Sequence, residues 1–290
     1  MIERLEHPGA ARRYCAAVRA RGASLGFVPT MGALHDGHLS LVRLAKNSCD
    51  VVCASVFVNP LQFNDPRDYE RYPRDLDGDA RMLASEGADM LFSGTLAQFF
   101  PESGGDRSRI APVDPGPAAL GLEGAFRPGH FAGVATIVQR LFDVVEPDRA
   151  YFGEKDFQQT LVVRHLARSR SKPAVVVGPT TRAPDGLALS SRNALLTPGD
   201  RERAPAIFRA LTAARQAWRE RGVRAPAELS RAMADVLSAS GLATEYAEVR
   251  DPERWTEDPP QHALSHARAL IAARAGTVRL IDNLRLDEGS

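Results

Sequence analysis

The sequence predicts an α/β protein, with a doubly wound parallel sheet in an N-terminal domain and a smaller α+β domain at the C-terminus. The first observation is that short apolar runs alternate with stretches of helical periodicity, which is typical of parallel strands joined by helices. The second is the run VVCASVFV at 51–58, which is apolar almost throughout. A strand of that kind is covered by helices on both faces and is central in its sheet.

The elements of the N-terminal part follow in order along the chain. Apolar runs predict strands at 25–28, 50–58, 88–92, 149–152 and 174–177. Helical periodicity predicts a helix that begins near His38, one at 131–145 and one at 157–169. The glycine- and proline-rich passage 101–128 predicts a long loop. This alternation is that of a Rossmann-like sheet.

A new unit is predicted soon after Asn193. Thr197 is expected to cap a helix, with Pro198 at its first position and Asp200 in its first turn. Helices at about 198–221 and 225–240 precede an alternating strand at 244–249 and a hairpin-like pair at 267–273 and 278–282. We therefore expect a Rossmann-like domain at 1–183 and a smaller α+β domain at 184–290, with no internal repeat between them.

Composition argues against several classes of protein, since 290 residues with 44% hydrophobic and 25% charged are ordinary for a globular chain. No apolar run approaches the roughly 20 residues that cross a bilayer, and the N-terminus lacks the apolar segment of a signal peptide. A net charge of +1 gives no electrostatic reason for a nucleic-acid or membrane partner. Cys15, Cys49 and Cys53 show no CxxC spacing and are expected to be reduced, buried thiols. The sequence predicts a cytoplasmic protein.

The most informative stretch is VPTMGALHDGHLSLVRLAK at 28–46, where an apolar run leads through a glycine-spaced turn with two histidines into a helix. Gly32 and Gly37 would let the backbone approach phosphate oxygens, and the helix would point its unsatisfied N–H groups and positive dipole end at them. His35 and His38 are three residues apart, so both can face one ligand as largely neutral hydrogen-bond donors. Taken alone, the HxGH motif is equally compatible with a turn whose histidines are ordinary surface residues.

Polar residues also follow the other predicted strands. Ligands of open α/β sheets bind outside the carboxyl ends of the strands, so these residues are expected at one edge. They lie at 59–62, 153–156 and 180–182, and the segment DGLALSSRN at 185–193 adds two hydroxyls and a guanidinium. Their amide, ammonium and guanidinium groups suit phosphate and carboxylate ligands, although each segment alone could be an ordinary loop.

Six blocks occur in a fixed order: PTMGALHDGH, FVNPLQF, YPR at 72–74, RPGHFAGV, FGEKDFQQ and DGLALSSRN. With these blocks, the chain resembles the pantothenate synthetase (pantoate–β-alanine ligase) family, which belongs to the HxGH nucleotidyl-transfer superfamily. The resemblance covers nearly the whole chain. The HxGH block alone would also admit a cytidylyl- or adenylyltransferase or a class I aminoacyl-tRNA synthetase fragment, whereas FGEKDFQQ and RPGHF separate this family from those.

The resemblance implies a ligase that condenses pantoate with β-alanine to pantothenate in two steps. The pantoate carboxylate attacks the α-phosphate of ATP to give a pantoyl-adenylate and pyrophosphate, and the amine of β-alanine then displaces AMP. Charge on the triphosphate must be neutralised before an anion approaches it, so Mg²⁺ with ATP and basic side chains are expected. ATP, pantoate and β-alanine are the implied partners, with no tightly bound organic cofactor and with a homodimer as the assembly.

The same resemblance implies three groups of site residues. ATP contacts are expected from Met31, Gly32, Ala33, Leu34, His35, Asp36, Gly37, His38, Gly153, Glu154, Lys155, Asp156, Thr181, Leu189, Ser190, Ser191 and Arg192. Among these, His38 as proton donor, His35 and Lys155 are the expected catalytic residues. Pantoate contacts are expected from Gln62 and Gln159, with Asn59, Arg127 and His130 shaping the pocket, and Gln62 is also expected to contact β-alanine. The alternative for His130 is a hydrogen-bonding role in the core.

Two parts of the chain match the family less closely. After residues 72–74 the sequence reads DLDGDARML, so Gly78 separates Asp77 from Asp79, either of which could reach Mg²⁺ directly or through water. The alternative for this stretch is the N-terminal turn of a helix. The C-terminal domain matches mainly in pattern and is expected to act as a lid without catalytic residues.

Two further functions are compatible with the HxGH turn. A nucleotidyltransferase acting on another small substrate would release pyrophosphate and never AMP. A non-catalytic nucleotide-binding protein would bind ATP without turnover, but the presence of His35, His38, Lys155, Ser190 and Arg192 argues against it.

Overall fold

The computed structural model describes residues 2–168 and 170–288, which form two compact units. Unit 1 comprises Met1–Ala119, Glu123–Glu154 and Gln158–Pro179, and unit 2 comprises Leu120–Leu122, Lys155–Phe157 and Thr180–Ser290. The main division therefore falls between Pro179 and Thr180, and two short inner segments belong to unit 2. The domain extents expected from the sequence, 1–183 and 184–290, stay a prediction.

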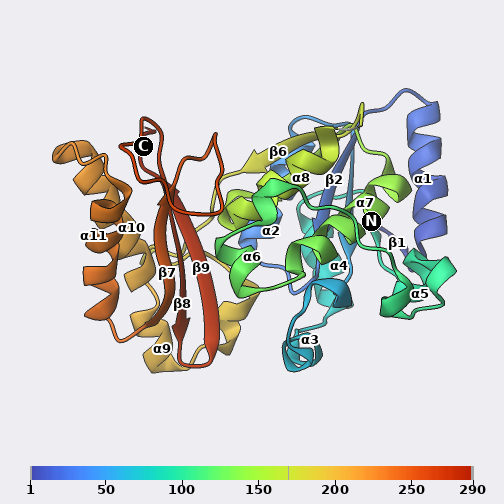
Figure 1. Cartoon of the computed structure of the whole chain (residues 1–290). Coiled ribbons are helices and arrows are strands. Elements are labelled where there is room, and N and C mark those ends of the chain that lie inside the picture. Colours follow the sequence, from blue (N-terminus) through green and yellow to red (C-terminus); the bar gives the residue numbers. More distant parts are fainter. Residues whose placement is uncertain (1, 169, 289–290) are drawn as a thin grey trace. The chain divides into compact units, whose positions relative to one another are not determined.

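Unit 1 is built on a parallel sheet of six strands among the described residues (Figure 1). The strands are β1 (Glu3–Leu5), β2 (Leu25–Thr30), β3 (Val51–Val56), β4 (Met90–Phe92), β5 (Arg149–Gly153) and β6 (Ala174–Gly178). Their order is β1-β4-β3-β2-β5-β6, and every pairing is parallel. The chain runs from β2 to β3 on one side and later returns to β5 on the other, so the switch point lies between β2 and β5. The doubly wound sheet is confirmed.

The helices of the N-terminal part agree with the predicted ones and add several short ones. They are α1 (Pro8–Ala20), α2 (Asp36–Lys46), α3 (Pro66–Arg71), α4 (Leu76–Ser85), α5 (Leu96–Phe99), α6 (Leu122–Phe126), α7 (His130–Val145) and α8 (Phe157–Arg168), with a 3-10 turn η1 at Pro60–Gln62. Ser169, the last residue of the predicted helix 157–169, lies outside the described residues. Short helices also interrupt the passage 101–128, which was expected to be loop.

Alternation along β2 and β3 explains why these strands are apolar at nearly every position. Phe27 and Cys53 lie in a core that also contains residues of α1 and α7. Val28 and Ala54, one position further along each strand, lie in a second core with residues of α2 and α4. Because successive side chains of a strand point to opposite faces, a sheet with helices on both faces needs apolar residues at every position.

Unit 2 carries an antiparallel sheet in the order β7-β8-β9 (Figure 1). Its elements are β7 (Ala243–Arg250), β8 (Arg268–Ala275), β9 (Val278–Arg285), α9 (Pro198–Arg203), α10 (Ala206–Glu220) and α11 (Pro226–Ser238). Helix α10 contacts β8 and β9, and α11 contacts β7. The shared core contains Leu211, Trp218, Met233 and Ile271. The smaller α+β part of the predicted fold is therefore confirmed.

The prediction of a single helix at about 198–221 is wrong, because the structure has two helices there, α9 and α10. The predicted start is confirmed, since Thr197 caps α9 and its Oγ1 accepts a hydrogen bond from Asp200 N at 3.2 Å. The break falls at Pro205, which precedes α10. Proline has no N–H to continue the helical ladder and its ring collides with the carbonyl one turn earlier, so the helix ends there.

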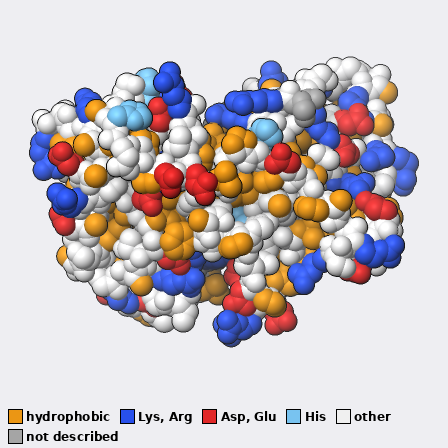
Figure 2. Space-filling model, viewed as in Figure 1, with side chains coloured by type: hydrophobic (Ala, Val, Ile, Leu, Met, Phe, Trp, Pro, Cys, Tyr) orange, Lys and Arg blue, Asp and Glu red, His pale blue; other side chains and the backbone are white. Residues whose placement is uncertain are grey.

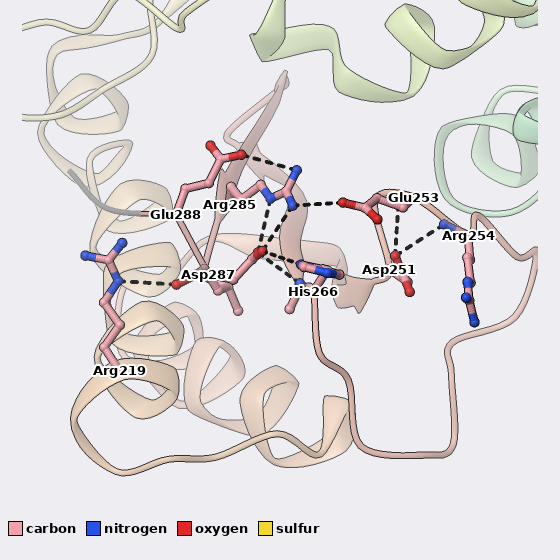
Figure 3. Close-up of polar contacts among 10 residues, drawn as sticks. Arg219, Asp251, Glu253, Arg254, His266, Arg285, Asp287 and Glu288 are labelled. Atoms are coloured by element: carbon pink, nitrogen blue, oxygen red, sulfur yellow. Dashed lines mark hydrogen bonds and ion pairs between the residues drawn. The ribbon is translucent and has the colours of Figure 1, made fainter.

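A cluster of charged residues fastens the end of β9 (Figure 3). Asp287 accepts hydrogen bonds from Ala267 N at 3.0 Å and from Arg285 Nε at 3.1 Å, and its Oδ2 lies 2.9 Å from His266 Nδ1. Arg285 also pairs with Glu253 at 3.3 Å. The hydrogen bond to Asp287 raises the pKa of His266 above its ordinary value. The cluster thus ties the segment after β9 to the residues before β8.

The distribution of surface charge, the character of the helices and the state of the cysteines can each be compared with the expectations from composition. Acidic and basic side chains are interspersed on the face of the molecule that Figure 2 shows. Among the described residues, no helix has the length and apolar character needed to span a bilayer. Cys15, Cys49 and Cys53 are buried free thiols, as predicted.

Candidate functional site

The HxGH turn follows β2 and caps helix α2 with its own histidines. His35 is the N-cap residue, and its Nδ1 accepts a hydrogen bond from Gly37 N at 3.1 Å. His38 Nδ1 accepts from His35 N at 3.3 Å, so the two imidazoles form a reciprocal capping box. Their ring centroids lie 4.1 Å apart. Both histidines are therefore fixed side by side at the start of the helix.

These hydrogen bonds determine where each histidine ring carries its proton. A ring nitrogen that accepts a bond from a backbone N–H has no proton of its own, so a neutral ring keeps its proton on Nε2. This holds for His35 and for His38, because both use Nδ1 as the acceptor. The arrangement is that of two neutral imidazoles with an Nε2–H group each, which is the kind of donor that an anionic ligand requires.

The first amides of α2 are not the donors that the sequence suggests. Gly37 N bonds to the His35 ring, and the amides of His38 and Leu39 bond to the His35 carbonyl at 2.8 and 3.2 Å. The expectation of unsatisfied helix amides is wrong for these three groups, because His35 accepts from all of them. Asp36, also expected at ATP, is exposed and forms an ion pair with Arg43.

A buried carboxylate, that of Asp79, holds the turn before the histidines. Its Oδ1 accepts from Leu34 N at 2.8 Å and its Oδ2 from Ala33 N at 3.1 Å. Ala33 has φ of 51°, in the left-handed region that side chains disfavour. A Cβ on Gly32 would lie 2.8 Å from Asp79 Oδ2 and 2.9 Å from a methyl of Val56, so glycine is required there. Burial raises the pKa of Asp79, and the two backbone bonds oppose the shift.

The two aspartates considered for Mg²⁺ lie in the first turn of α4. Asp75 caps this helix and accepts from Gly78 N at 2.8 Å, so the alternative of a helix N-terminal turn is confirmed. Asp77 pairs with Arg4 at 2.8 Å, and both oxygens of Asp79 accept backbone hydrogen bonds. Within residues 2–168 and 170–288, no group of three or more His, Cys, Asp or Glu side chains could hold a metal ion. The aspartates do not form a metal site by themselves, and their role toward Mg²⁺ stays a prediction.

A cavity of ≈ 350 Å³ lies beside the same turn in unit 1. Met31 and Gly32 line it together with the segments that follow β3 and β4 and the start of α4. Arg74 also lines it, and its guanidinium lies 4.9 Å from the centroid of the Tyr69 ring. A cavity of this size at the carboxyl ends of parallel strands accommodates a small organic molecule.

Gln62 ends η1 and is held by the residues predicted to shape its pocket. Asn59 Nδ2 donates to Gln62 Oε1 at 2.9 Å and to Gly133 O at 3.1 Å. His130 Nδ1 donates to the Gln62 carbonyl at 2.9 Å, and Arg127 donates to the same carbonyl at 3.2 Å and to His130 Nε2 at 3.1 Å. His130 is 6% exposed and therefore has the core hydrogen-bonding role named as its alternative. Its contact with pantoate stays a prediction.

The structure separates the two adjacent glutamines at the start of α8. Gln158 is buried, its Oε1 accepts from Glu123 N at 3.1 Å, and its Nε2 donates to Ala118 O at 2.9 Å. Gln159 is partly exposed. Of the two, Gln159 is the one that a ligand can reach, and it is the one predicted to hold pantoate.

Lys155 lies in unit 2, in a 3-10 turn at Glu154–Asp156 that follows Gly153 at the end of β5. Its carbonyl accepts a hydrogen bond from Asn283 Nδ2 of β9 at 2.8 Å. Its ammonium lies 3.3 Å from Asp156 Oδ1, and its side chain is 19% exposed. A lysine with a fixed main chain and a long, mobile stem can follow phosphate oxygens as they move.

The segment 181–192 of unit 2 is a hairpin followed by a capped turn. Leu189 N donates to Thr181 O at 2.9 Å, and Arg182 forms a bridge with Ala188. Ser190 then caps a 3-10 turn at Ser191–Leu195, because its Oγ accepts from Arg192 N at 3.3 Å. The residues of this segment predicted to contact ATP include four that are partly exposed: Thr181, Ser190, Ser191 and Arg192. Leu189, also predicted to contact ATP, is partly exposed as well.

Sequence reasoning missed the roles that Asp79 and Asn283 have in holding these turns. Asp79 was considered as a metal ligand or as part of a helix N-terminal turn, and the C-terminal domain was expected to act as a lid without catalytic residues. For Asn283 a signal exists, since Asp282 and Asn283 are two adjacent polar residues inside the strand VRLIDNLR at 278–285, where at least one of two neighbouring positions is expected to face the core. Aspartate and asparagine are poor strand formers and are seldom buried without a partner, so such a pair indicates a specific contact.

The model of one protein family matches the chain over residues 3–285, and its description is "Pantoate-beta-alanine ligase". The pantothenate synthetase of Rubrobacter xylanophilus is 48% identical over 294 residues, which cover 97% of this chain and 98% of that protein. The pantothenate synthetase of Thermus thermophilus is 47% identical over 264 residues, which cover 90% of this chain and 93% of that protein.

Solved structures are similar over the same length. The crystal structure of pantothenate synthetase from Thermus thermophilus matches with a TM-score of 0.87 at 45% identity, covering 98% of this chain and 99% of that one. A structure of pantoate-β-alanine ligase from Francisella tularensis, complexed with "Beta-gamma ATP" and β-alanine, matches with a TM-score of 0.80 at 34% identity, covering 100% and 99%.

Proposed function

The chain belongs to the pantoate–β-alanine ligase family, and on that premise we propose how its residues carry out the reaction. It is an ATP-using ligase that joins pantoate to β-alanine. The observation that carries the residue assignment is the reciprocal cap of His35 and His38, which fixes two Nε2–H donors before any ligand arrives. Donors that are already oriented stabilise developing charge without a cost of reorganisation.

In the first step, a carboxylate oxygen of pantoate bonds to the α-phosphorus of ATP. The bond from that phosphorus to the bridging oxygen breaks, and pyrophosphate leaves with both electrons of the broken bond. His35 and His38 donate from Nε2 to phosphate oxygens, and His38 is the proton donor. Met31 to Leu34 contribute main-chain contacts in the turn that Asp79 holds.

Lys155, Ser190 and Arg192 contact the phosphates of ATP. The ammonium and the guanidinium reduce the negative charge that the pantoate carboxylate must approach, and the hydroxyl adds a neutral donor. Gly153, Glu154, Asp156, Thr181, Leu189 and Ser191 complete the nucleotide contacts. The fixed turns in which these residues lie support the assignment.

In the second step, the amine nitrogen of β-alanine attacks the acyl carbon of the pantoyl-adenylate. The bond from that carbon to the phosphate oxygen breaks, AMP leaves, and the amine gives up its proton. Gln62 and Gln159 hold the hydroxyls and carboxylate of pantoate, and Gln62 also contacts β-alanine. The network of Asn59, Arg127 and His130 around Gln62 supports this assignment, because it fixes both the main chain and the amide oxygen of Gln62.

Mg²⁺ enters as a complex with ATP. Phosphate oxygens and water would supply most of its ligands, because Mg²⁺ keeps several waters and takes few carboxylates. A bound Mg²⁺ would offset triphosphate charge. Asp77 is paired with Arg4 and Asp79 with the backbone, so no step is assigned to them through the metal, and their reach to Mg²⁺, directly or through water, stays a prediction.

The assembly is a homodimer and the compartment is the cytoplasm. The dimer is proposed from family resemblance and the compartment from composition, and the dimer has a direct test. Light scattering on the purified chain should give about twice the 31.4 kDa of one copy. A mass of one copy would contradict the dimer.

The test of the function measures pyrophosphate and AMP release with Mg-ATP and pantoate, with and without β-alanine. We expect pyrophosphate to depend on pantoate, and AMP and pantothenate to accumulate only when β-alanine is added. Pyrophosphate without AMP under all conditions would favour a nucleotidyltransferase, and ATP binding without turnover would favour a non-catalytic protein.

Two cap-preserving variants test the histidines. His35→Asn and His38→Gln each keep a side-chain acceptor for the capping box but replace the imidazole by an amide, which cannot transfer a proton and holds its N–H groups at other positions than the imidazole Nε2–H. We expect roughly a hundredfold loss of pyrophosphate release, with stability changed by less than about 1 kcal/mol. The matched control is His262→Asn at an exposed position, which should leave the rate unchanged. Full activity in both cap-preserving variants would overturn the assignment.

A further inference from the structure

Strand β9 of unit 2 contains a buried polar pair, Asp282 and Asn283, each 4% exposed. Neighbouring positions of a strand face opposite sides, so two adjacent residues can reach two different segments. Burial raises the pKa of Asp282, and its ion pair with Arg182 opposes that shift. Apolar residues of similar volume at such positions are often as stabilising as a buried ion pair or more so, so stability alone does not explain the pair.

Asn283 fastens the segment that carries Lys155. Its Nδ2 donates to the Lys155 carbonyl at 2.8 Å. Its Oδ1 accepts a hydrogen bond from Arg268, which is itself buried. The guanidinium of Arg268 lies 4.2 Å from the centroid of the Phe157 ring. Residues 155 and 157 are therefore both bound to one buried group centred on Asn283.

Asp282 fastens the hairpin that leads to Ser190 and Arg192. Its two oxygens accept from Arg182 Nη1 at 2.5 Å and from Nη2 at 3.0 Å, a bidentate pair. Arg182 Nη1 also donates to Gly186 O at 3.1 Å, within the same hairpin. Arg182 in addition lies over the Phe208 ring at 4.2 Å from its centroid. The hairpin is thus held to β9 through one guanidinium that makes several contacts.

We propose that Asp282 and Asn283 are positioning residues, which together anchor to one strand the two segments that carry Lys155 and Ser190–Arg192. The inference rests on the proposed function, which assigns these side chains to the phosphates of ATP. Neither Asp282 nor Asn283 touches the substrate in this account. They set the spacing of the phosphate contacts within unit 2, so their loss should weaken the use of ATP more than the use of pantoate.

The main test is Asn283→Asp, which keeps an oxygen for Arg268 but removes the donor to the Lys155 carbonyl and opposes that carbonyl with negative charge. We expect KM for ATP to rise about tenfold, the effect of losing one such hydrogen bond, while KM for pantoate stays within twofold. The control is Leu280→Ala, a buried residue of the same strand. Leu280→Ala should lower the free energy of unfolding at least as much as Asn283→Asp does. It should leave the KM values for ATP and for pantoate within twofold of those of the unchanged enzyme.

A double-mutant cycle with Lys155→Ala separates the inference from the function on which it rests. If Asn283 acts through Lys155, Asn283→Asp should change ATP binding by less than twofold in the Lys155→Ala background. An undiminished tenfold effect there would overturn the inference. A normal ATP KM in the single Lys155→Ala variant would instead overturn the role of Lys155.

A second variant keeps the proposal testable if Asn283→Asp does not fold. Asp282→Asn removes the charge that Arg182 faces and keeps the shape of the side chain. We expect a rise of about tenfold in KM for ATP here as well, with KM for pantoate within twofold. Equal rises in both KM values, or none in either, would show a merely structural role.

Discussion

Replacement of Asp79 by alanine tests whether this carboxylate shapes the HxGH turn. The change leaves the amides of Ala33 and Leu34 without their acceptor and empties a buried position. A buried donor left unsatisfied costs about 1–3 kcal/mol, and Ala33 also needs support for its positive φ. Two unsatisfied donors together cost about 2–6 kcal/mol in stability. The variant no longer buries the carboxylate charge, and this gain is subtracted from that cost. We expect a loss of about 3 kcal/mol in the free energy of unfolding.

The assay is urea unfolding combined with pyrophosphate-release kinetics. The control is Asp77→Ala, two residues away in the same helix turn, where an exposed pair with Arg4 should contribute no more than about 1 kcal/mol. Asp79→Ala should also raise KM for ATP at a temperature where the variant is folded, and excess Mg²⁺ should not restore it. Equal stability losses in the two variants, or full recovery with Mg²⁺, would refute a turn-holding role.

Two further outcomes follow from contacts in each unit. Gly133→Ala should destabilise by about 1–3 kcal/mol and raise KM for pantoate, because its Cβ would lie 2.1 Å from the carbonyl oxygen of Leu61 beside the Gln62 pocket. Kinetics and urea unfolding check this against Gly199→Ala, whose Cβ would meet no atom within 4 Å. His266→Gln should remove a pH dependence of stability. The bond to Asp287 raises the pKa of His266, so its stabilisation is complete below about pH 6.5 and is lost as pH rises through the raised value. Between about pH 5.5 and 8.5, the free energy of unfolding should fall more steeply with pH for the unchanged protein than for His266→Gln. Equal slopes for the two proteins would contradict this.

The fold was predictable where hydrophobic pattern alone determines an element. Strand β3 needs apolar residues on both faces because two separate cores cover it, and that requirement is visible as a run that is apolar almost throughout. Strand β1 gave no such signal, because Glu3 and Arg4 are exposed and the strand lies beside β4 at the edge of the sheet. The break at Pro205 was missed because the apolar periodicity continues across it, whereas the backbone chemistry of proline does not.

The site was predictable where a residue type has one dominant chemistry. The histidines, and the neutral state expected of them, came from the motif and its position after a strand. Their use of Nδ1 as a helix cap did not, because capping by imidazole depends on backbone angles that the sequence does not specify. Gln158 and Gln159 are identical in chemistry, so only their burial separates the structural glutamine from the accessible one.

Several residues close backbone hydrogen bonds in the turns that carry the proposed ligand contacts. The rings of His35 and His38 cap α2 with one nitrogen and keep a donor on the other, while Asp79 and Asn283 hold the main chain of turns whose side chains are proposed to bind ATP. Alanine at any of the four positions removes an acceptor or donor that the backbone needs, so stability and activity fall together. A loss of activity in an alanine variant therefore does not identify a catalytic residue here. Replacements that keep the backbone contact, such as His38→Gln, separate the two effects because they remove the chemistry and leave the turn in place.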